Sequence, residues 1–221
     1  MRALRLRVAR LLHVEPDEIA PATAGFAMFF LLFAGYFTLR PVRETMGIAG
    51  GVENLQWLFT GTFVATLAAL PLFGWIASRV RRRRIVYWLF GFFATSLLAF
   101  ALGFLARPDD IWLARAFYIW LSMFNLVAIS AAWSVLADLF APTEARRLFA
   151  LMASGASLGG LAGPLMGVLL VAAIGHAGLL TLSALLLIGS ASCVRRLQGW
   201  RDAHPQSRAQ SIQRRQPLGG N

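Results

Sequence analysis

The stretch IVYWLFGFFATSLLAFALGFLA, at residues 85–106, decides the fold class of this chain. It contains no acidic or basic side chain. A helix of this length crosses the roughly 30 Å of hydrocarbon in a bilayer, because each residue adds about 1.5 Å. A buried helix of a soluble protein would show a polar face and would rarely run so long. The stretch therefore predicts a transmembrane helix.

Five more stretches share this apolar character and are separated by short polar segments: residues 22–39, 56–78, 111–137, 148–174 and 177–194. Backbone polar groups in lipid must be satisfied within the protein, and the period-2 alternation of a membrane barrel is absent. We therefore predict an all-α polytopic membrane protein with six transmembrane helices. Residues 1–21 would form a cytoplasmic N-terminal segment, 22–194 one membrane domain, and 195–221 a disordered basic cytoplasmic tail.

The basic residues predict the orientation of the chain. Seventeen of the 21 lie before the first stretch, between the second and third, between the fourth and fifth, or after the sixth. All these segments fall on one side of the membrane if the chain crosses six times. The positive-inside rule then places both termini in the cytoplasm, and we expect a multi-pass protein of a bacterial inner membrane. Because the arginines lie beside the spans, the net charge of +11 indicates contact with the lipid bilayer and not with nucleic acid.

Signals for an enzyme are weak in this sequence. Cys193 is the only cysteine, which excludes a disulfide within the chain and argues against a zinc cluster. The tetrapeptide at residues 155–158, GASL, lacks the final glycine of an intramembrane serine protease, and no phosphate-binding loop or paired His/Glu site occurs. We expect no catalytic residues, no metal and no cofactor.

Charged residues near the membrane are the first candidates for a binding site, because burying an ion in lipid is costly. If the first helix continues past Leu39, then Arg40 and Arg43 share a face and Glu44 follows Arg40 by four residues. Two guanidinium groups are suited to a carboxylate or phosphate. The alternative is that this segment forms a wet loop outside the membrane.

Two residues of the fourth stretch extend the candidate substrate-binding set. Arg115 lies near one end of that stretch, where its side chain could either reach the interface or face an internal cavity. Asn125 lies deeper and needs a partner inside the bundle, more often another helix than a substrate.

A glycine ridge in the fifth stretch is the strongest packing signal. Its members recur every fourth residue beside a proline: Gly155, Gly159, Gly163 and Gly167, with Pro164. Such a face lets another backbone approach closely, and Pro164 can kink the helix. We expect these glycines to serve helix packing, including self-association if the protein acts alone.

The segment between the second and third stretches, GWIASRVRRRR at residues 74–84, resembles the cytoplasmic loop signature of the major facilitator superfamily. Gly74, Arg79, Arg82 and Arg83 match that signature, whereas Ser78 stands where the family usually has Asp. The resemblance implies a gating role for these residues. Asp138 and Arg147, at the same predicted face, are expected to form an ion pair or to contact the loop.

A closer likeness is to the bacterial ATP/ADP translocase-like branch of these carriers. It depends on motifs that occur in the expected order: LRPVRE at 39–44, FNL at 124–126, SAAW at 130–133, ADLF at 137–140 and RRLF at 146–149. The resemblance implies a secondary carrier whose site lies at mid-membrane between two six-helix halves, of which one is present here.

We therefore expect a half-length facilitator-type transporter of a small anionic solute that works as a homodimer or with a second six-helix half. The alternative is a non-transporting carrier fragment, or a membrane scaffold that assembles through glycine-lined helices.

Overall fold

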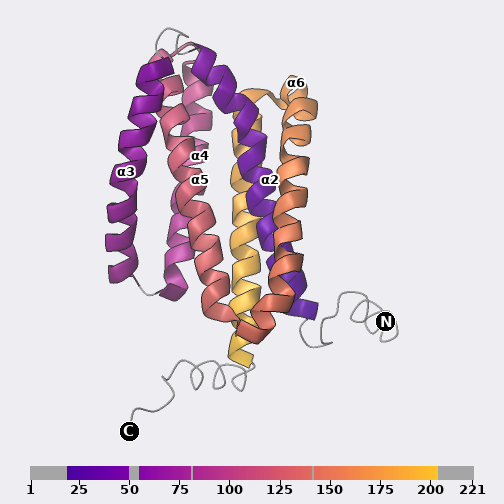
Figure 1. The fold of residues 1–221 in the computed structure, drawn as a ribbon. Helices are drawn as coiled ribbons and strands as arrows, with labels where there is room; N and C mark the ends of the chain where they lie inside the picture. Colours follow the sequence, from indigo (N-terminus) through magenta and orange to yellow (C-terminus); the bar gives the residue numbers. More distant parts are fainter. Residues whose placement is uncertain (1–18, 50–54, 81, 141, 204–221) are drawn as a thin grey trace.

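The computed structural model describes residues 19–49, 55–80, 82–140 and 142–203. Within these residues the regular secondary structure is entirely helical and forms an upright bundle (Figure 1). The helices are α2 (Ile19–Ala49), α3 (Leu55–Arg79), α4 (Arg82–Ala106), α5 (Ile111–Leu139) and α6 (Pro142–Ala203). We call the end where α2 begins and α6 finishes the lower end, and the opposite one the upper end.

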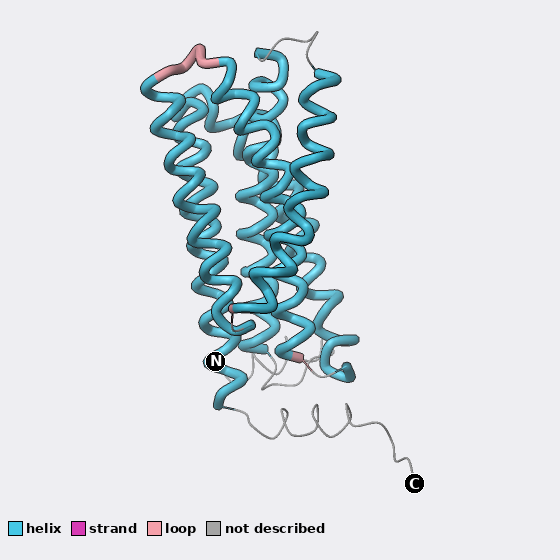
Figure 2. The backbone as a smooth tube through the Cα atoms, turned by 90° about the vertical axis from the view of Figure 1, so that its left-hand side faces the viewer, coloured by secondary structure: helices cyan, strands magenta, loops and turns pink. Residues whose placement is uncertain are grey.

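The long element α6 reverses its direction at Gly175. Its 62 residues would extend about 90 Å if straight, far more than a bilayer. Gly175 has φ 65° and ψ −177°, a conformation essentially restricted to glycine. The first arm, 142–174, rises to the upper end, and the second arm, 176–203, returns to the lower end (Figure 1). Figure 2 shows the same bundle from the side.

All five helices are long and apolar enough to cross a membrane. The prediction of an all-helical, multi-pass membrane protein is thus confirmed. Six separate helices are not observed, because the fifth and sixth predicted stretches are the two arms of the single element α6.

Two helix ends differ from the sequence prediction. The first stretch was expected over 22–39, but α2 continues through Pro41 to Ala49, with Val42 and Met46 buried against its neighbours. The segment 195–203, expected in a disordered tail, belongs to α6. There Leu197 is buried, and the Tyr87 hydroxyl donates a hydrogen bond of 3.0 Å to the Gln198 side chain. Residues 1–18 and 204–221, the rest of the predicted terminal segments, lie outside the described residues.

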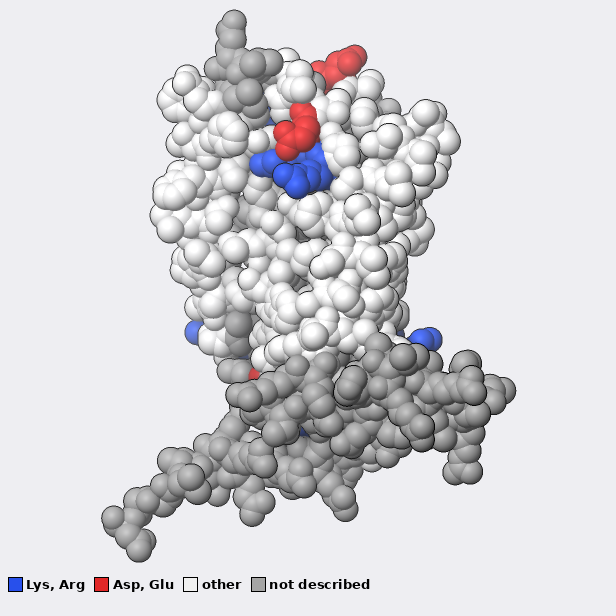
Figure 3. All heavy atoms as spheres, turned by 45° about the vertical axis from the view of Figure 1, so that its right-hand side comes forward, with Lys and Arg blue, Asp and Glu red and all other residues white. Residues whose placement is uncertain are grey.

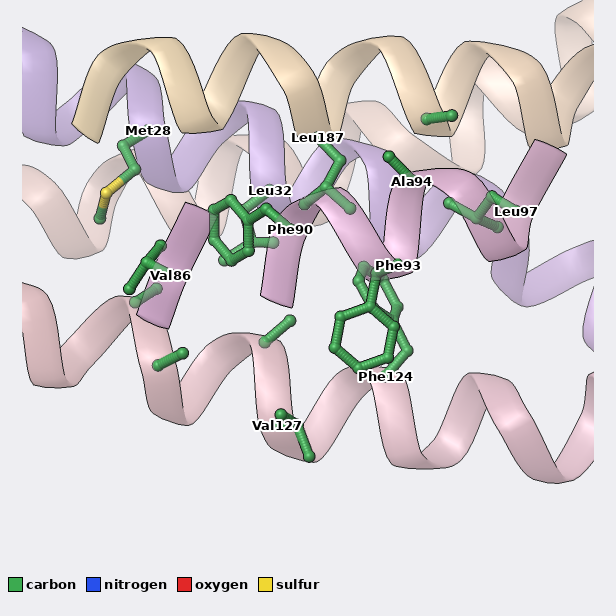
Figure 4. Packing of buried hydrophobic residues seen from close by; sticks show 14 of the residues in the cluster. Met28, Leu32, Val86, Phe90, Phe93, Ala94, Leu97, Phe124, Val127 and Leu187 are labelled. Atoms are coloured by element: carbon green, nitrogen blue, oxygen red, sulfur yellow. The ribbon is translucent and has the colours of Figure 1, made fainter. Parts of the chain in front are cut away.

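The apolar core is shared by α2, α4, α5 and α6, and within it α4 packs against both α5 and the second arm of α6 (Figure 4). Phe93 of α4 meets Phe124 of α5 edge-to-face, with ring centres 4.8 Å apart. By contrast, α3 lies at the outside of the bundle, against α5, and exposes most of its large side chains.

The glycine ridge of α6 packs within the chain, against α2. A Cβ atom on Gly155 or Gly159 would collide with the carbonyl oxygen of Phe26 or Phe30, and one on Gly163 would lie 2.8 Å from the Ala34 carbonyl oxygen. Residues 155–167 of α6 therefore lie directly against α2, and the two helices run in the same direction.

Hydroxyl groups reinforce this contact between α2 and both arms of α6. Thr38 donates a hydrogen bond of 3.1 Å to the Gly163 carbonyl, while Ser183 and Ser190 of the second arm donate to the carbonyls of Gly35 and Met28. Close packing and hydrogen bonds between helices are the main sources of association in lipid. Because α2 covers the ridge, a second copy could reach these glycines only by displacing α2.

Candidate functional site

The helices α2 and α5 are antiparallel, and contacts near both ends set their register. Toward the lower end, the rings of Phe29 and Trp133 are 4.6 Å apart. Toward the upper end, the guanidinium carbon of Arg43 lies 3.8 Å from the centre of the Tyr118 ring. The predicted charged residues of α2 therefore face the upper half of α5.

Arg43 is held by α5 on several sides. Its Nε donates to the Tyr118 carbonyl at 3.4 Å, and its Nη2 donates to the Ser122 hydroxyl at 3.2 Å. Its Nη1 forms an ion pair of 3.2 Å with Glu44. The Arg43 side chain is only 19% exposed, whereas that of Glu44 is 60% exposed. Arg43 thus joins the two helices and places a cation in an otherwise apolar wall.

Arg40 has different surroundings, although it lies less than one turn away on α2. Its guanidinium is 5.9 Å from the Phe37 ring and exposed, and within the described part of the chain no hydrogen bond or ion pair engages it. The helix continues through both arginines, so this segment is helical and not a loop; whether it is buried in the membrane or reaches into water stays a prediction. In Figure 3 a basic patch with an acidic one above it interrupts the uncharged upper wall.

The face of α5 opposite these arginines carries a polar stripe. Arg115, Tyr118, Ser122 and Asn125 are spaced three, four and three residues apart, which places them on one helix face. The Oδ1 atom of Asn125 is buried, and it has no hydrogen-bond partner among the described residues. A buried amide oxygen without a hydrogen bond destabilises the fold by about 1–3 kcal/mol. A hydrogen-bond donor from a ligand or a neighbouring helix would remove this penalty at Asn125.

The register places Asn125 close to the level of the α2 arginines. Its neighbour Phe124 contacts Tyr36, with ring centres 6.1 Å apart, and Tyr36 lies one turn below Arg40. The fold therefore brings Arg40, Arg43, Glu44 and Asn125 to one region between α2 and α5, as four of the five candidate substrate-binding residues.

Arg115, the fifth candidate, lies at the upper end of the stripe and turns toward α3. Its guanidinium is 5.0 Å from the Trp112 ring. It lines an open groove of about 550 Å³ between α3 and α5, together with Trp57, Leu58 and Ile119.

The sequence profile of the Major Facilitator Superfamily matches residues 19–218, nearly the whole chain. The chain belongs to this family. No curated protein and no solved structure matches it. Members of the superfamily are generally transporters and not enzymes, which supports a transporter-type function. Among the described residues of this superfamily member, no three His, Cys, Asp or Glu side chains lie together in a way that could hold a metal ion.

The residues that resemble the superfamily's loop signature lie at the lower end, opposite the arginine cluster (Figure 1). Arg79 lies 5.3 Å from the Trp75 ring, and a Cβ atom on Gly74 would meet no atom within 4 Å. Asp138 is exposed near the end of α5. The side chains of Arg82, Arg83 and Arg147 are outside the described part of the structure, so their gating role stays a prediction.

Tyr118 and Ser122 are the site residues that the sequence analysis missed. Both are uncharged, and neither belongs to a motif that was recognised. The regular spacing from Arg115 through Tyr118 and Ser122 to Asn125 is the signal that could have found them, because four polar or amphipathic side chains share one face of an apolar helix.

Proposed function

We propose that this protein is a half-length, facilitator-type secondary transporter of a small anionic solute in a bacterial inner membrane. The chain would cross the membrane six times, with the two arms of α6 as the last two crossings and both termini in the cytoplasm. Two observations support this proposal. The chain matches the superfamily profile, and its first and last described residues lie at the same, lower end of the bundle.

The observation that carries the anionic solute is the contrast between the two arginines. Arg43 is tethered to Ser122 and the Tyr118 backbone, so its position is fixed. Arg40 is exposed beside it, in a helix that would lie within the membrane. A cation there must be compensated by water, by a carboxylate or by an anionic ligand. Glu44 is already paired with Arg43, so the two parallel N–H donors of the Arg40 guanidinium would bind the solute.

A transport cycle would need a second set of helices across this site. In the proposed mechanism, a second copy or a separate six-helix half faces the arginine cluster, and the two halves rock around the bound solute. Gly74, Arg79, Arg82, Arg83, Asp138 and Arg147 would gate the lower end. The scaffold alternative has less support, because α2 already covers the glycines that would have formed its surface.

The experiment is uptake by proteoliposomes that contain the purified chain. Phosphate, succinate and ADP serve as labelled probes; ADP is included because the sequence resembles the ATP/ADP translocase-like branch. We expect uptake of at least one probe by the wild type and none by Arg40→Ala. Arg40→Lys keeps the charge but loses the bidentate fork, so we expect weaker uptake by about tenfold, equivalent to about 1.4 kcal/mol.

Arg107→Gln is the matched control, because Arg107 is an exposed arginine at the same end of the bundle. It should leave uptake at the wild-type level. Equal uptake by Arg40→Ala and wild type would contradict the site, and failure of the folded wild type to move any of the three probes would contradict the proposed solute class.

A further inference from the structure

The face of α2 below Arg40 carries a row of phenylalanines that the charge of the proposed site does not explain. Its members are spaced four, three and four residues apart and reach Arg40 after three more, so they share one helix face with it: Phe26, Phe30, Phe33 and Phe37. We call these four residues the phenylalanine stripe. All four are partly exposed, so no described helix covers them completely. The site therefore joins an exposed cation to an exposed aromatic surface.

Neighbouring rings of the phenylalanine stripe stack on one another, and the uppermost ring contacts the arginine. The ring centres of Phe26 and Phe30 are 6.4 Å apart with an interplanar angle of 5°, and those of Phe33 and Phe37 are 6.1 Å apart at 29°. The guanidinium carbon of Arg40 lies 5.9 Å from the centre of the Phe37 ring. A ligand with a single ring can therefore touch the cation and the aromatic surface at the same time.

Contact with lipid does not account for a stripe made only of phenylalanine. The first arm of α6 exposes a stripe with the same alternation of three and four residues, and that stripe is aliphatic: Leu158, Leu161, Leu165 and Val168. Acyl chains are aliphatic as well and offer no ring to stack. Aromatic rings gain from a second ring beyond the area that they bury. The phenylalanine stripe is therefore suited to a flat aromatic ligand.

We propose that the site prefers an aromatic monoanion, in which a carboxylate or sulfonate group is attached directly to one ring. This inference rests on the proposed function, because it names the solute class of the same site. One negative charge is matched there, since Arg43 is already paired with Glu44 and Arg40 is the exposed cation.

In this arrangement the two parallel N–H donors of Arg40 would bind the charged group, and the ring would pack on Phe37 and Phe33. Phosphate or succinate can also pair with Arg40, but either one leaves the phenylalanine stripe uncovered. Both are therefore expected to bind more weakly than an aromatic monoanion.

The test is isothermal titration calorimetry of the purified full chain in detergent, with titration into detergent alone as the blank. Benzenesulfonate and cyclohexanesulfonate are the two ligands; both are ionised at neutral pH and carry a six-membered carbon ring, but only the first ring is aromatic. The saturated ring buries at least as much apolar area, so burial alone would not favour benzenesulfonate. Stacking should make the wild type bind benzenesulfonate about fivefold more tightly.

Phe37→Leu removes the ring next to Arg40 and keeps an apolar side chain. Its preference for benzenesulfonate should fall to about one, while its affinity for cyclohexanesulfonate stays near that of the wild type. If this variant does not fold, because Phe37 packs beside Gly160 of α6, Phe33→Leu replaces it and should lower the preference in the same direction. Phe92→Leu is the matched control, because Phe92 is 58% exposed on α4 and lies outside the phenylalanine stripe. It should keep the wild-type preference.

Three results would overturn the aromatic preference: equal affinity of the folded wild type for both sulfonates or no binding of benzenesulfonate, a preference that survives in folded Phe37→Leu, and an equal loss of preference in Phe92→Leu. Each of them leaves the proposed function to be decided by the uptake measurements. Arg40→Ala should abolish binding of both sulfonates. Binding that persists in this variant would contradict the site itself and not only the preference for a ring.

Discussion

At the scale of the residue, two glycines of the same helical bundle show how much the environment decides. Gly159 and Gly91 both lie inside apolar helices, and composition alone treats them alike. At Gly159 a Cβ atom would collide with the Phe30 carbonyl of α2, whereas at Gly91 it would meet nothing within 4 Å. Only the first glycine is required for close approach of two backbones.

Alanine at these two positions should therefore have opposite effects. Gly159→Ala must push α2 away from α6, and overpacking of this kind costs about 1–3 kcal/mol. Gly91→Ala adds a methyl group in open space and restricts the unfolded chain, so we expect no loss of stability and a gain of up to about 1 kcal/mol. Thermal unfolding of both variants in the same detergent measures the difference. Equal melting temperatures would show that α2 and α6 can separate without cost.

Some features of the candidate site could be predicted from single residues of the sequence, and others could not. Arg40, Arg43 and Asn125 were predictable, because charged and amide groups in an apolar span are conspicuous. The difference in contacts between Arg40 and Arg43 was not predictable. It depends on Ser122 and the Tyr118 carbonyl, which reach Arg43 only through the register of α2 and α5. That register results from contacts between residues that lie 75 or more positions apart in the sequence. The hydropathy of a segment does not show which distant residues it will contact.

At the scale of the element, hydropathy located the helices but not their ends. A proline after a charged residue normally suggests that a helix stops, yet α2 continues through Pro41. Val42 and Met46 find apolar neighbours there, and Gly47 lets Tyr118 pack closely. The extension of α6 to Ala203 likewise follows from partners on other helices, such as Tyr87 for Gln198. Such tertiary contacts override local signals that a sequence reading must use.

The reversal of α6 gives a prediction at this scale. Gly175 combines φ 65° with ψ −177°, so Gly175→Ala should strain the backbone by about 1–3 kcal/mol. Gly199→Ala, in open space on the second arm, should cause no loss of stability, as at Gly91. Thermal unfolding compares the two variants. A Gly175 variant as stable as the Gly199 variant would mean that the turn can adopt another conformation at no cost.

At the scale of the whole molecule, the two ends of the bundle differ in charge. Among the described residues, the lower end carries Arg79, Arg84, Arg195, Arg196 and Arg201 together with Asp138 and Asp202, and the upper end carries Arg40, Arg43, Arg107 and Arg115 together with Glu44, Asp109 and Asp110. The lower end is therefore the more basic one. The number of apolar stretches and the pattern of arginines were sufficient to predict this polarity, because it depends on the order of segments and not on their packing.

The last prediction concerns the orientation of this bundle. The positive-inside rule places the basic lower end in the cytoplasm. We expect a single cysteine at Pro108, in the upper loop between α4 and α5, to react in intact spheroplasts with a membrane-impermeant maleimide. A single cysteine at Ala203, at the end of α6, should react only after the membrane is permeabilised. Both variants are made with Cys193→Ala, which removes the one native thiol. Labelling in the reverse order would show that the basic end faces outward. Labelling of both positions in intact spheroplasts would place residues 108 and 203 on the same side and contradict the odd number of crossings between them.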